Sequence, residues 1–271
     1  MTSDIEAALA SVHMLEEPPI SGSNGSGTIF FTGCSLKCVF CQNHGISAEN
    51  HGKRISVERL SEIMLERQAL GVHNINLVTA THYVPSVIKA VEIAKGNGLT
   101  VPIVYNSGGY ENLETIKMLE GMVDIYLPDI KYFSKELSEK YSNAADYFEY
   151  AVPAVSEMYR QTGGNIFGED GLLKKGVIIR HMPLPTHKED SFKVLDSIKQ
   201  NFGNEAYVSI LNQYTPMYKA SEHNEINRRL MSIEYTRIID HFFEIGLKNG
   251  YMQKRESATA KYTPIFDLSG L

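Results

Sequence analysis

Six short runs of strand-forming residues alternate with amphipathic helical stretches, and this alternation limits the fold more than any other feature of the sequence. Each run is rich in Val, Ile, Leu, Phe or Tyr. The runs are residues 28–33, 74–79, 101–106, 123–129, 177–181 and 207–213. Strand, helix and strand in succession is typical of a parallel sheet, because the helix returns the chain to the end where the next strand begins. We therefore predict an α/β fold built from six βα units.

Between and after these runs, apolar residues recur at helical spacing, as Leu60, Ile63 and Met64 do. Helices are predicted at residues 57–69, 84–95, 144–160 and 225–247. The last stretch is expected to form one long or two short helices that close the bottom or side of a barrel. We expect a single domain, with an N-terminal extension over residues 1–26 and a C-terminal helical segment over residues 218–271.

Composition narrows the class of protein further. With 43% hydrophobic and 21% charged residues, the chain is typical of a soluble globular protein. The formal net charge of −6 argues against nucleic acid as a partner. No apolar run approaches the roughly 20 residues of a membrane helix, so no membrane partner is expected. The N-terminus lacks the basic start and apolar stretch of a signal peptide, so we expect a cytoplasmic location.

Polar side chains follow the predicted strands. They include Thr79, Thr81 and His82, Asn106 and Ser107, Asp129 and Lys131, and Arg180 and His181. Because the carboxyl ends of parallel strands meet at one edge of a sheet, these groups are expected to face one mouth. The alternative for any one of them is an ordinary polar loop residue. Their recurrence after strand upon strand favours a functional site.

The cysteines of the chain are Cys34, Cys38 and Cys41, in a C-x3-C-x2-C spacing directly after the first run. Three thiols within eight residues suggest a metal rather than disulfides. A zinc site normally needs four protein ligands, and His44 or His51 is the nearby candidate for the fourth. A [4Fe–4S] cluster on three cysteines would leave one iron without a protein thiolate, open to another ligand.

The cysteine loop, with the aromatic Phe40 before its last cysteine, resembles the signature of radical S-adenosylmethionine (radical SAM) enzymes. Other runs resemble more closely the branch related to the pyruvate formate-lyase activating enzymes. They are residues 18–22, 25–31, 41–43, 74–79, 105–110, 124–132 and 179–181. The resemblance extends over roughly residues 16–260, almost the whole chain.

This resemblance implies a partial (β/α)6 TIM-like barrel of the radical SAM type. It implies a [4Fe–4S] cluster on the three cysteines, with the amine and carboxylate of S-adenosylmethionine (SAM) bound to the fourth iron. One electron from the reduced cluster then cleaves SAM to methionine and a 5′-deoxyadenosyl radical, which abstracts a hydrogen atom. Phe40 would help to position the adenine, and Asn106 and Ser107 would meet the ribose. Such a cluster is expected to be oxygen-sensitive, so we expect function under low oxygen.

The sequence departs from the family pattern after the second run. Family members usually carry Gly-Gly-Glu there to bind the methionyl amine, whereas this chain has Thr79-Ala80-Thr81-His82. Thr79 and Thr81 hydroxyls are possible acceptors for that amine, and His82 is either a contact or a structural group. His181 has the same two readings. No ferredoxin-like segment with further cysteines is present, so by cysteine ligation the chain can hold one cluster.

Three charged residues remain as catalytic candidates. Asp129 and Lys131 are two apart, so on a strand both side chains face the same side, where they form an ion pair or orient a substrate. Arg180 suits the SAM carboxylate or an anionic substrate group, and pairing with Asp129 is the alternative. We assign all three to the pocket as catalytic candidates.

The function expected first is abstraction of a hydrogen atom from a glycine of a partner glycyl radical enzyme. A radical SAM enzyme that acts on a small molecule or a free peptide is the alternative. A non-catalytic Cys3His zinc protein, with His44 as the fourth ligand, is a distant third. A radical SAM enzyme would also need an electron donor, which we expect to be of the flavodoxin or ferredoxin type.

Overall fold

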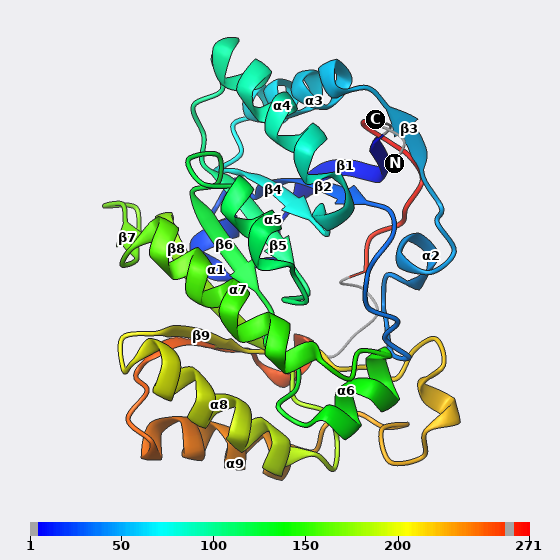
Figure 1. Ribbon diagram of the computed structural model, residues 1–271, viewed down its shortest axis with the longest axis vertical. Helices are drawn as coiled ribbons and strands as arrows, with labels where there is room; N and C mark the ends of the chain where they lie inside the picture. The colour runs from blue at the N-terminus through cyan, green and yellow to red at the C-terminus, as the bar shows by residue number, and fades with distance from the viewer. Residues whose placement is uncertain (1–4, 258–262) are drawn as a thin grey trace.

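The protein is built on one large twisted sheet (Figure 1). The computed structural model describes residues 5–257 and 263–271. In these residues the strand order is β10-β9-β8-β6-β5-β4-β2-β1-β3, with β7 paired to β8 outside this path. The pairs from β2 to β10 along this order are parallel, and the sheet does not close on itself. The fold is therefore the predicted partial α/β barrel.

All six predicted strands are present. The strands are β1 (Ile5–His13), β2 (Ser26–Phe31), β3 (Lys53–Ile55), β4 (Ile75–Val78), β5 (Ile103–Ser107), β6 (Ile125–Pro128), β7 (Ile166–Phe167), β8 (Leu173–His181), β9 (Tyr207–Ile210) and β10 (Asn249–Met252). The buried strands are mostly apolar, because a parallel sheet covered on both faces needs apolar side chains on both.

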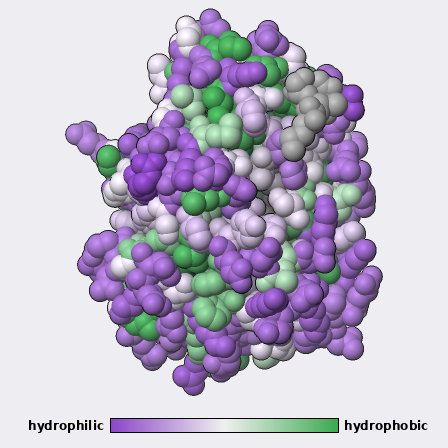
Figure 2. All heavy atoms as spheres, in the orientation of Figure 1, coloured by the Kyte–Doolittle hydropathy of each residue, from purple (hydrophilic) through white to green (hydrophobic). Residues whose placement is uncertain are grey.

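Helices cover the outer face of the sheet (Figure 1). The helices of the described residues are α1 (Pro18–Ser21), α2 (His44–Ser47), α3 (Val57–Ala69), α4 (Val84–Gly96), α5 (Leu113–Met118), α6 (Lys135–Ser142), α7 (Tyr147–Thr162), α8 (Lys188–Phe202) and α9 (Ser232–Glu244), with 3-10 turns at Thr81–Tyr83, Ala220–Glu222 and Arg255–Ser257. Of these, α1 lies inside the barrel. Helix α3 has the predicted bounds. Its Ser56 caps it by accepting from the Arg59 N–H, which satisfies a backbone donor that the first turn leaves free. The face of the molecule seen in Figure 2 is largely hydrophilic.

The structure differs from the sequence prediction at both ends of the chain. The expected N-terminal extension contains β1, which pairs antiparallel with β2. The expected C-terminal helical segment contains β10, which pairs parallel with β9, and only Ser232–Glu244 of the helix predicted at 225–247 is helical. The two strands are short or rich in alanine, and pairing with a neighbour, rather than local propensity, makes them strands.

Along each barrel strand, successive side chains face opposite sides of the sheet. Ile103 and Tyr105 of β5 pack with the outer helices, whereas Val104 packs inside with Ile20 of α1. Helix α1, which lies behind β6 in Figure 1, thus fills the amino end of the barrel interior. Asn106 is the next inward residue on β5, and it lines a cavity above this apolar layer. On β5 the inward side chains thus change from apolar Val104 to polar Asn106 toward the carboxyl end of the strand.

Within the described residues, no helix is long and apolar enough to span a bilayer.

Candidate active site

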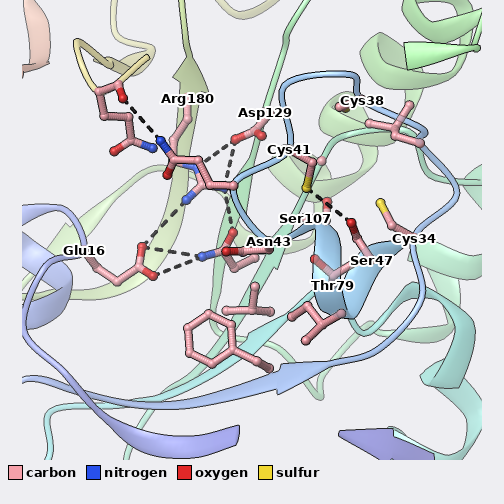
Figure 3. A pocket seen from close by; sticks show the side chains of 18 of the residues that line it. Glu16, Cys34, Cys38, Cys41, Asn43, Ser47, Thr79, Ser107, Asp129 and Arg180 are labelled. Carbon is pink, nitrogen blue, oxygen red and sulfur yellow. Dashed lines mark hydrogen bonds and ion pairs between the residues drawn. The ribbon is translucent and has the colours of Figure 1, made fainter. Parts of the chain in front are cut away.

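Three cysteines face a cavity at the carboxyl ends of the strands (Figure 3). Cys34, Cys38 and Cys41 lie on the loop between β2 and α2, each is partly buried, and none forms a disulfide. All three line one cavity of about 250 Å³, which we call the cluster cavity. The expectation that these thiols face a common site at the mouth of the barrel is met.

The C-terminal end of α6 holds the cysteine loop in place. The backbone N–H of Lys37 donates to Ser142 O at 3.0 Å, and that of Val39 donates to Tyr141 O at 2.9 Å. The Cys38 Sγ lies 3.0 Å from Ser142 Oγ, which in turn lies 2.8 Å from Tyr132 Oη. These contacts join the loop to a segment about 100 residues later, and nothing in the local sequence predicts them.

A serine hydroxyl also lies beside Cys41. The Cys41 Sγ lies 3.2 Å from Ser47 Oγ, at the end of α2. Burial raises the pKa of the Cys38 thiol to about 12, against the attraction of the nearby Lys131, and burial also raises the pKa of Cys34. Both thiols are thus protonated without metal, and metal binding has to displace their protons.

The donor set fits a [4Fe–4S] cluster with one open iron. Three thiols line one partly enclosed cavity, and the polar groups across from them are not cysteines. The zinc alternative required His44, but its ring stacks on Tyr218 with centroids 4.8 Å apart. No three His, Cys, Asp or Glu side chains of the described residues form a site for a single metal ion. Neither His44 nor His51 is among the described residues that line the cluster cavity, so neither stands beside the three thiols as a fourth zinc ligand.

A charged group stands across the cluster cavity from the cysteines (Figure 3). Arg180 of β8 donates from Nε to Asp129 Oδ1 at 2.8 Å and from Nη2 to Asn106 Oδ1 at 2.6 Å. Lys131 forms an ion pair with the other oxygen of Asp129. Burial alone would raise the pKa of Asp129, but Arg180 and Lys131 hold it below its usual range. The predicted catalytic candidates therefore meet in one ionised network.

Glu16 also belongs to this network, and it was not among the residues predicted for the site. Its Oε2 lies 3.7 Å from Arg180 Nη1, and both of its carboxylate oxygens accept weakly from Asn106 Nδ2, at 3.4 and 3.5 Å. Glu16 follows β1, in the segment that was predicted to be an N-terminal extension. No local signal in the sequence indicates that this segment enters the barrel.

The predicted SAM-binding residues divide into two groups. Thr79, Asn106 and Ser107 line the cluster cavity. Thr81 instead donates to Glu111 Oε1 at 2.7 Å, and His82 lies against Gly33 and Tyr83. Neither Thr81 nor His82 is among the described residues that line the cavity. The turn after β4 directs one of its polar side chains to the site and the other two away, which sequence order alone does not reveal.

Phe40 and His181 also have defined surroundings. Phe40 packs edge-on against Tyr214 with centroids 5.6 Å apart, and lines a cavity of about 180 Å³ that Cys38 and Cys41 share. His181 faces the outer side of β8, with Nδ1 2.8 Å from Ile130 O. Burial lowers the pKa of His181 to about 4, so the ring is neutral. Its position makes it a structural neighbour of the site rather than a wall of the cluster cavity.

Two residues after β5 complete the carboxyl end of the barrel. Gly109 has φ +80°, and a Cβ there would overlap the carbonyl oxygen of Asp129. Glu111 is 2% exposed, and burial raises its pKa to about 7 against hydrogen bonds from Thr81, Ser107 and Tyr105. The sequence signal for this turn was its Gly-Gly pair, which marks a close approach of two backbones.

The three-cysteine loop at the carboxyl ends of a parallel partial barrel defines a class of iron–sulfur enzymes. The family model described as the radical SAM superfamily matches residues 28–193, and the chain belongs to this superfamily. Members of this family use a [4Fe–4S] cluster and SAM, which are therefore the cofactors of this protein.

A curated relative and several solved structures extend this result. An uncharacterized protein of Methanocaldococcus jannaschii is 33% identical over 241 residues, which cover 84% of this chain and 64% of the relative. The chain thus spans less than two thirds of the length of that relative. Similar solved structures include methylornithine synthase (PylB), with TM-score 0.55 and 16% identity, over 78% of this chain and 59% of that one.

Two further structures have the same fold. SuiB of Streptococcus suis bound to SAM gives TM-score 0.52 at 10% identity, over 82% of this chain and 48% of that one. The hydrogenase maturase HydG of Carboxydothermus hydrogenoformans gives TM-score 0.55 at 13% identity, over 86% of this chain and 55% of that one. These likenesses support the fold and do not favour the activating-enzyme branch over the others.

Proposed function

We propose that this protein reductively cleaves SAM and uses the resulting radical to abstract a hydrogen atom from a substrate held in the barrel. The observation that carries the proposal is the cluster cavity, where three cysteines face Asn106, Ser107 and the Arg180 network. When bound, the reduced cluster supplies one electron to the SAM sulfonium, giving methionine and a 5′-deoxyadenosyl radical that takes a hydrogen atom to become 5′-deoxyadenosine.

The residues of the chain would bind and orient these groups. The three cysteines would hold three irons, and the Asn106 amide and Ser107 hydroxyl would form hydrogen bonds to SAM. The apolar side chains of Phe30 and Leu36 line the same cavity and exclude water from it. Arg180 has its guanidinium held by Asp129, which fixes the position from which it would bind a carboxylate.

For the substrate, we propose a small polar molecule. The charged side chains of Asp129, Lys131 and Arg180 line the cluster cavity, and such walls suit a polar substrate. A glycine of a partner glycyl radical enzyme is the second candidate, supported by the runs that resemble the activating enzymes and by the open edge of the sheet. We further propose an electron donor of the flavodoxin or ferredoxin type.

The experiment that tests SAM cleavage is anaerobic reconstitution with iron and sulfide, reduction by dithionite in the presence of SAM, and chromatographic detection of 5′-deoxyadenosine. Wild type is expected to produce it and Cys38→Ala is not. Absence of 5′-deoxyadenosine from wild type with a fully loaded cluster would refute the proposal.

The partner is tested separately. The reduced protein with SAM is incubated with the glycyl radical enzyme encoded beside its gene, where one exists, and the mixture is examined by electron paramagnetic resonance. A glycyl radical signal that needs both proteins and SAM would replace the small-molecule proposal by activation of a partner. Its absence, with 5′-deoxyadenosine formed, favours the small molecule.

A further inference from the structure

A second cavity, of about 630 Å³, lies where the sheet is open, and we call it the seam cavity. Residues 14–18, which follow β1, line one side, and residues 251–254, from β10 onward, line the other, with Ser209 of β9 between them. Glu16, Glu17 and Gln253 line both this cavity and the cluster cavity, so the two meet there. No cysteine is among the described residues that line the seam cavity.

The junction of the two cavities carries a buried carboxylate with an unused oxygen. Glu17 is 7% exposed, and its Oε2 has no hydrogen-bond partner in the part of the chain that the structure describes. Ser209 is 1% exposed, and its Oγ likewise has no hydrogen-bond partner among the described residues. A buried carboxylate oxygen without a donor is costly, because desolvation is not compensated. Both side chains line the cavity, so a ligand there can supply the missing donors.

The charges at this junction are not balanced. The described ionisable walls of the cluster cavity include the carboxylates of Glu16, Glu17 and Asp129 and the cations of Lys131 and Arg180. Asp129 forms ion pairs with both cations, and Arg180 also pairs with Glu16, so among the described side chains Glu17 has no ion-pair partner. Burial raises the pKa of Glu17 to about 6 against the attraction of Arg180, so the group is still ionised at neutral pH.

We propose that the seam cavity binds the protonated amino group of the substrate, with Glu17 as its ion-pair partner and Ser209 as a second acceptor. This inference rests on the proposed function, and it names the substrate class as a primary amine. An alkylammonium supplies the one positive charge and the N–H donors that Glu17 lacks. The remainder of the molecule would extend past Glu16 toward the cluster cavity, where the reacting carbon has to lie.

Two other charged residues line the outer part of the seam cavity. Lys254 and Glu256 are both exposed, so solvent screens their charges. Among the described residues, Lys254 forms no ion pair with Glu17 and so does not neutralise it. Glu256 therefore serves as a matched control, an acidic residue of the same cavity that is exposed instead of buried.

The test is anaerobic titration calorimetry on the reconstituted enzyme with SAM. The probes are pentylamine, pentanol and pentanoate, which share a chain length and differ in charge. We expect pentylamine to bind best, Glu17→Gln to weaken it at least tenfold, Glu17→Asp to weaken it less, and Glu256→Gln to leave it unchanged. Equal binding of pentylamine and pentanol, or full binding of pentylamine by Glu17→Gln, would overturn the inference.

Two further readouts separate this inference from the proposed function. If Glu17→Gln loses affinity for SAM and keeps that for pentylamine, the carboxylate serves SAM and the inference is wrong. If wild type binds pentylamine but yields no 5′-deoxyadenosine, the proposed function fails while the amine site stands. Glu17→Asp retains the charge, so a variant that folds is available even if the neutral one does not.

Discussion

The sulfur of Cys38 lies 3.0 Å from the hydroxyl oxygen of Ser142, 104 residues further along the chain. A cysteine sulfur bound to iron carries no hydrogen, so Ser142 has to donate to it. The oxygen of Ser142 then accepts from Tyr132, which is fully buried and whose pKa is raised by that burial, so it keeps its proton. The cluster site therefore includes a hydrogen-bond chain from Tyr132 through Ser142 to Cys38.

Replacing Ser142 by Ala is expected to lower the reduction potential of the cluster. A hydrogen bond to a ligating sulfur stabilises the reduced cluster, which carries more negative charge, so its loss favours the oxidised form. The potential is measured by redox titration with electron paramagnetic resonance. Ser138→Ala is the control, because Ser138 is equally buried on α6 but bonds only within the helix. An unchanged potential in Ser142→Ala would contradict the prediction.

Arg180→Lys is expected to destabilise the protein by about 2–3 kcal/mol. A lysine ammonium cannot hold Asp129 and Asn106 at once as the guanidinium does, so buried polar groups lose a partner. Differential scanning calorimetry measures the loss. In the control Arg59→Lys, the pair with Glu66 is partly exposed and the change should stay under about 1 kcal/mol. Equal effects of the two variants would refute this account.

Gly109→Ala is expected to cost at least about 2 kcal/mol and to reduce SAM cleavage. The alanine would have to adopt φ +80°, and its Cβ would displace the carbonyl oxygen of Asp129, which moves the ionised network. Gly164→Ala is the control, since no described heavy atom beyond residue 164 and its two chain neighbours lies within 4 Å of its Cβ position. Denaturant unfolding and the 5′-deoxyadenosine assay measure the two effects, and wild-type behaviour of Gly109→Ala would show that the backbone can adjust.

Glu111 is expected to make the protein less stable as the pH rises from about 4.5 to about 7. Burial raises the pKa of Glu111 to about 7, so in this interval the native state keeps a proton that the unfolded state has lost. The shift amounts to about 3 kcal/mol at 1.36 kcal/mol per pH unit.

The measurement compares urea unfolding of wild type and Glu111→Gln between pH 4.5 and 8. The difference between their free energies of unfolding should grow with pH up to about 7 and then level off. His181, whose pKa is lowered to about 4, acts in the opposite direction and cancels in the comparison. Parallel curves for the two proteins would show that Glu111 does not titrate in this range.

Much of the barrel was predictable because its signals are local. The six central strands have apolar runs, and α3 was predicted at its observed bounds because its apolar period and its Ser56 cap lie within one stretch of sequence. Strands β1 and β10 were not predicted because neither has a strong local strand signal. Each is extended because it pairs with a neighbouring strand, β1 with β2 and β10 with β9. Within the site, the cysteine spacing indicated a cluster loop, but Glu16 and Ser142 have no such spacing.

The sequence by itself determined the alternation that makes a parallel sheet, the three thiols on one loop, and the polar residues at the ends of strands. Only the tertiary structure decided which of those residues face the cluster cavity, and that Thr81 and His82 turn away from it. It also decided that Oε2 of Glu17 is buried with no hydrogen-bond partner among the described residues. The physical reason is range. Backbone preference and side-chain period act within a few residues, whereas burial, ion pairing and hydrogen bonding depend on groups that only folding brings together.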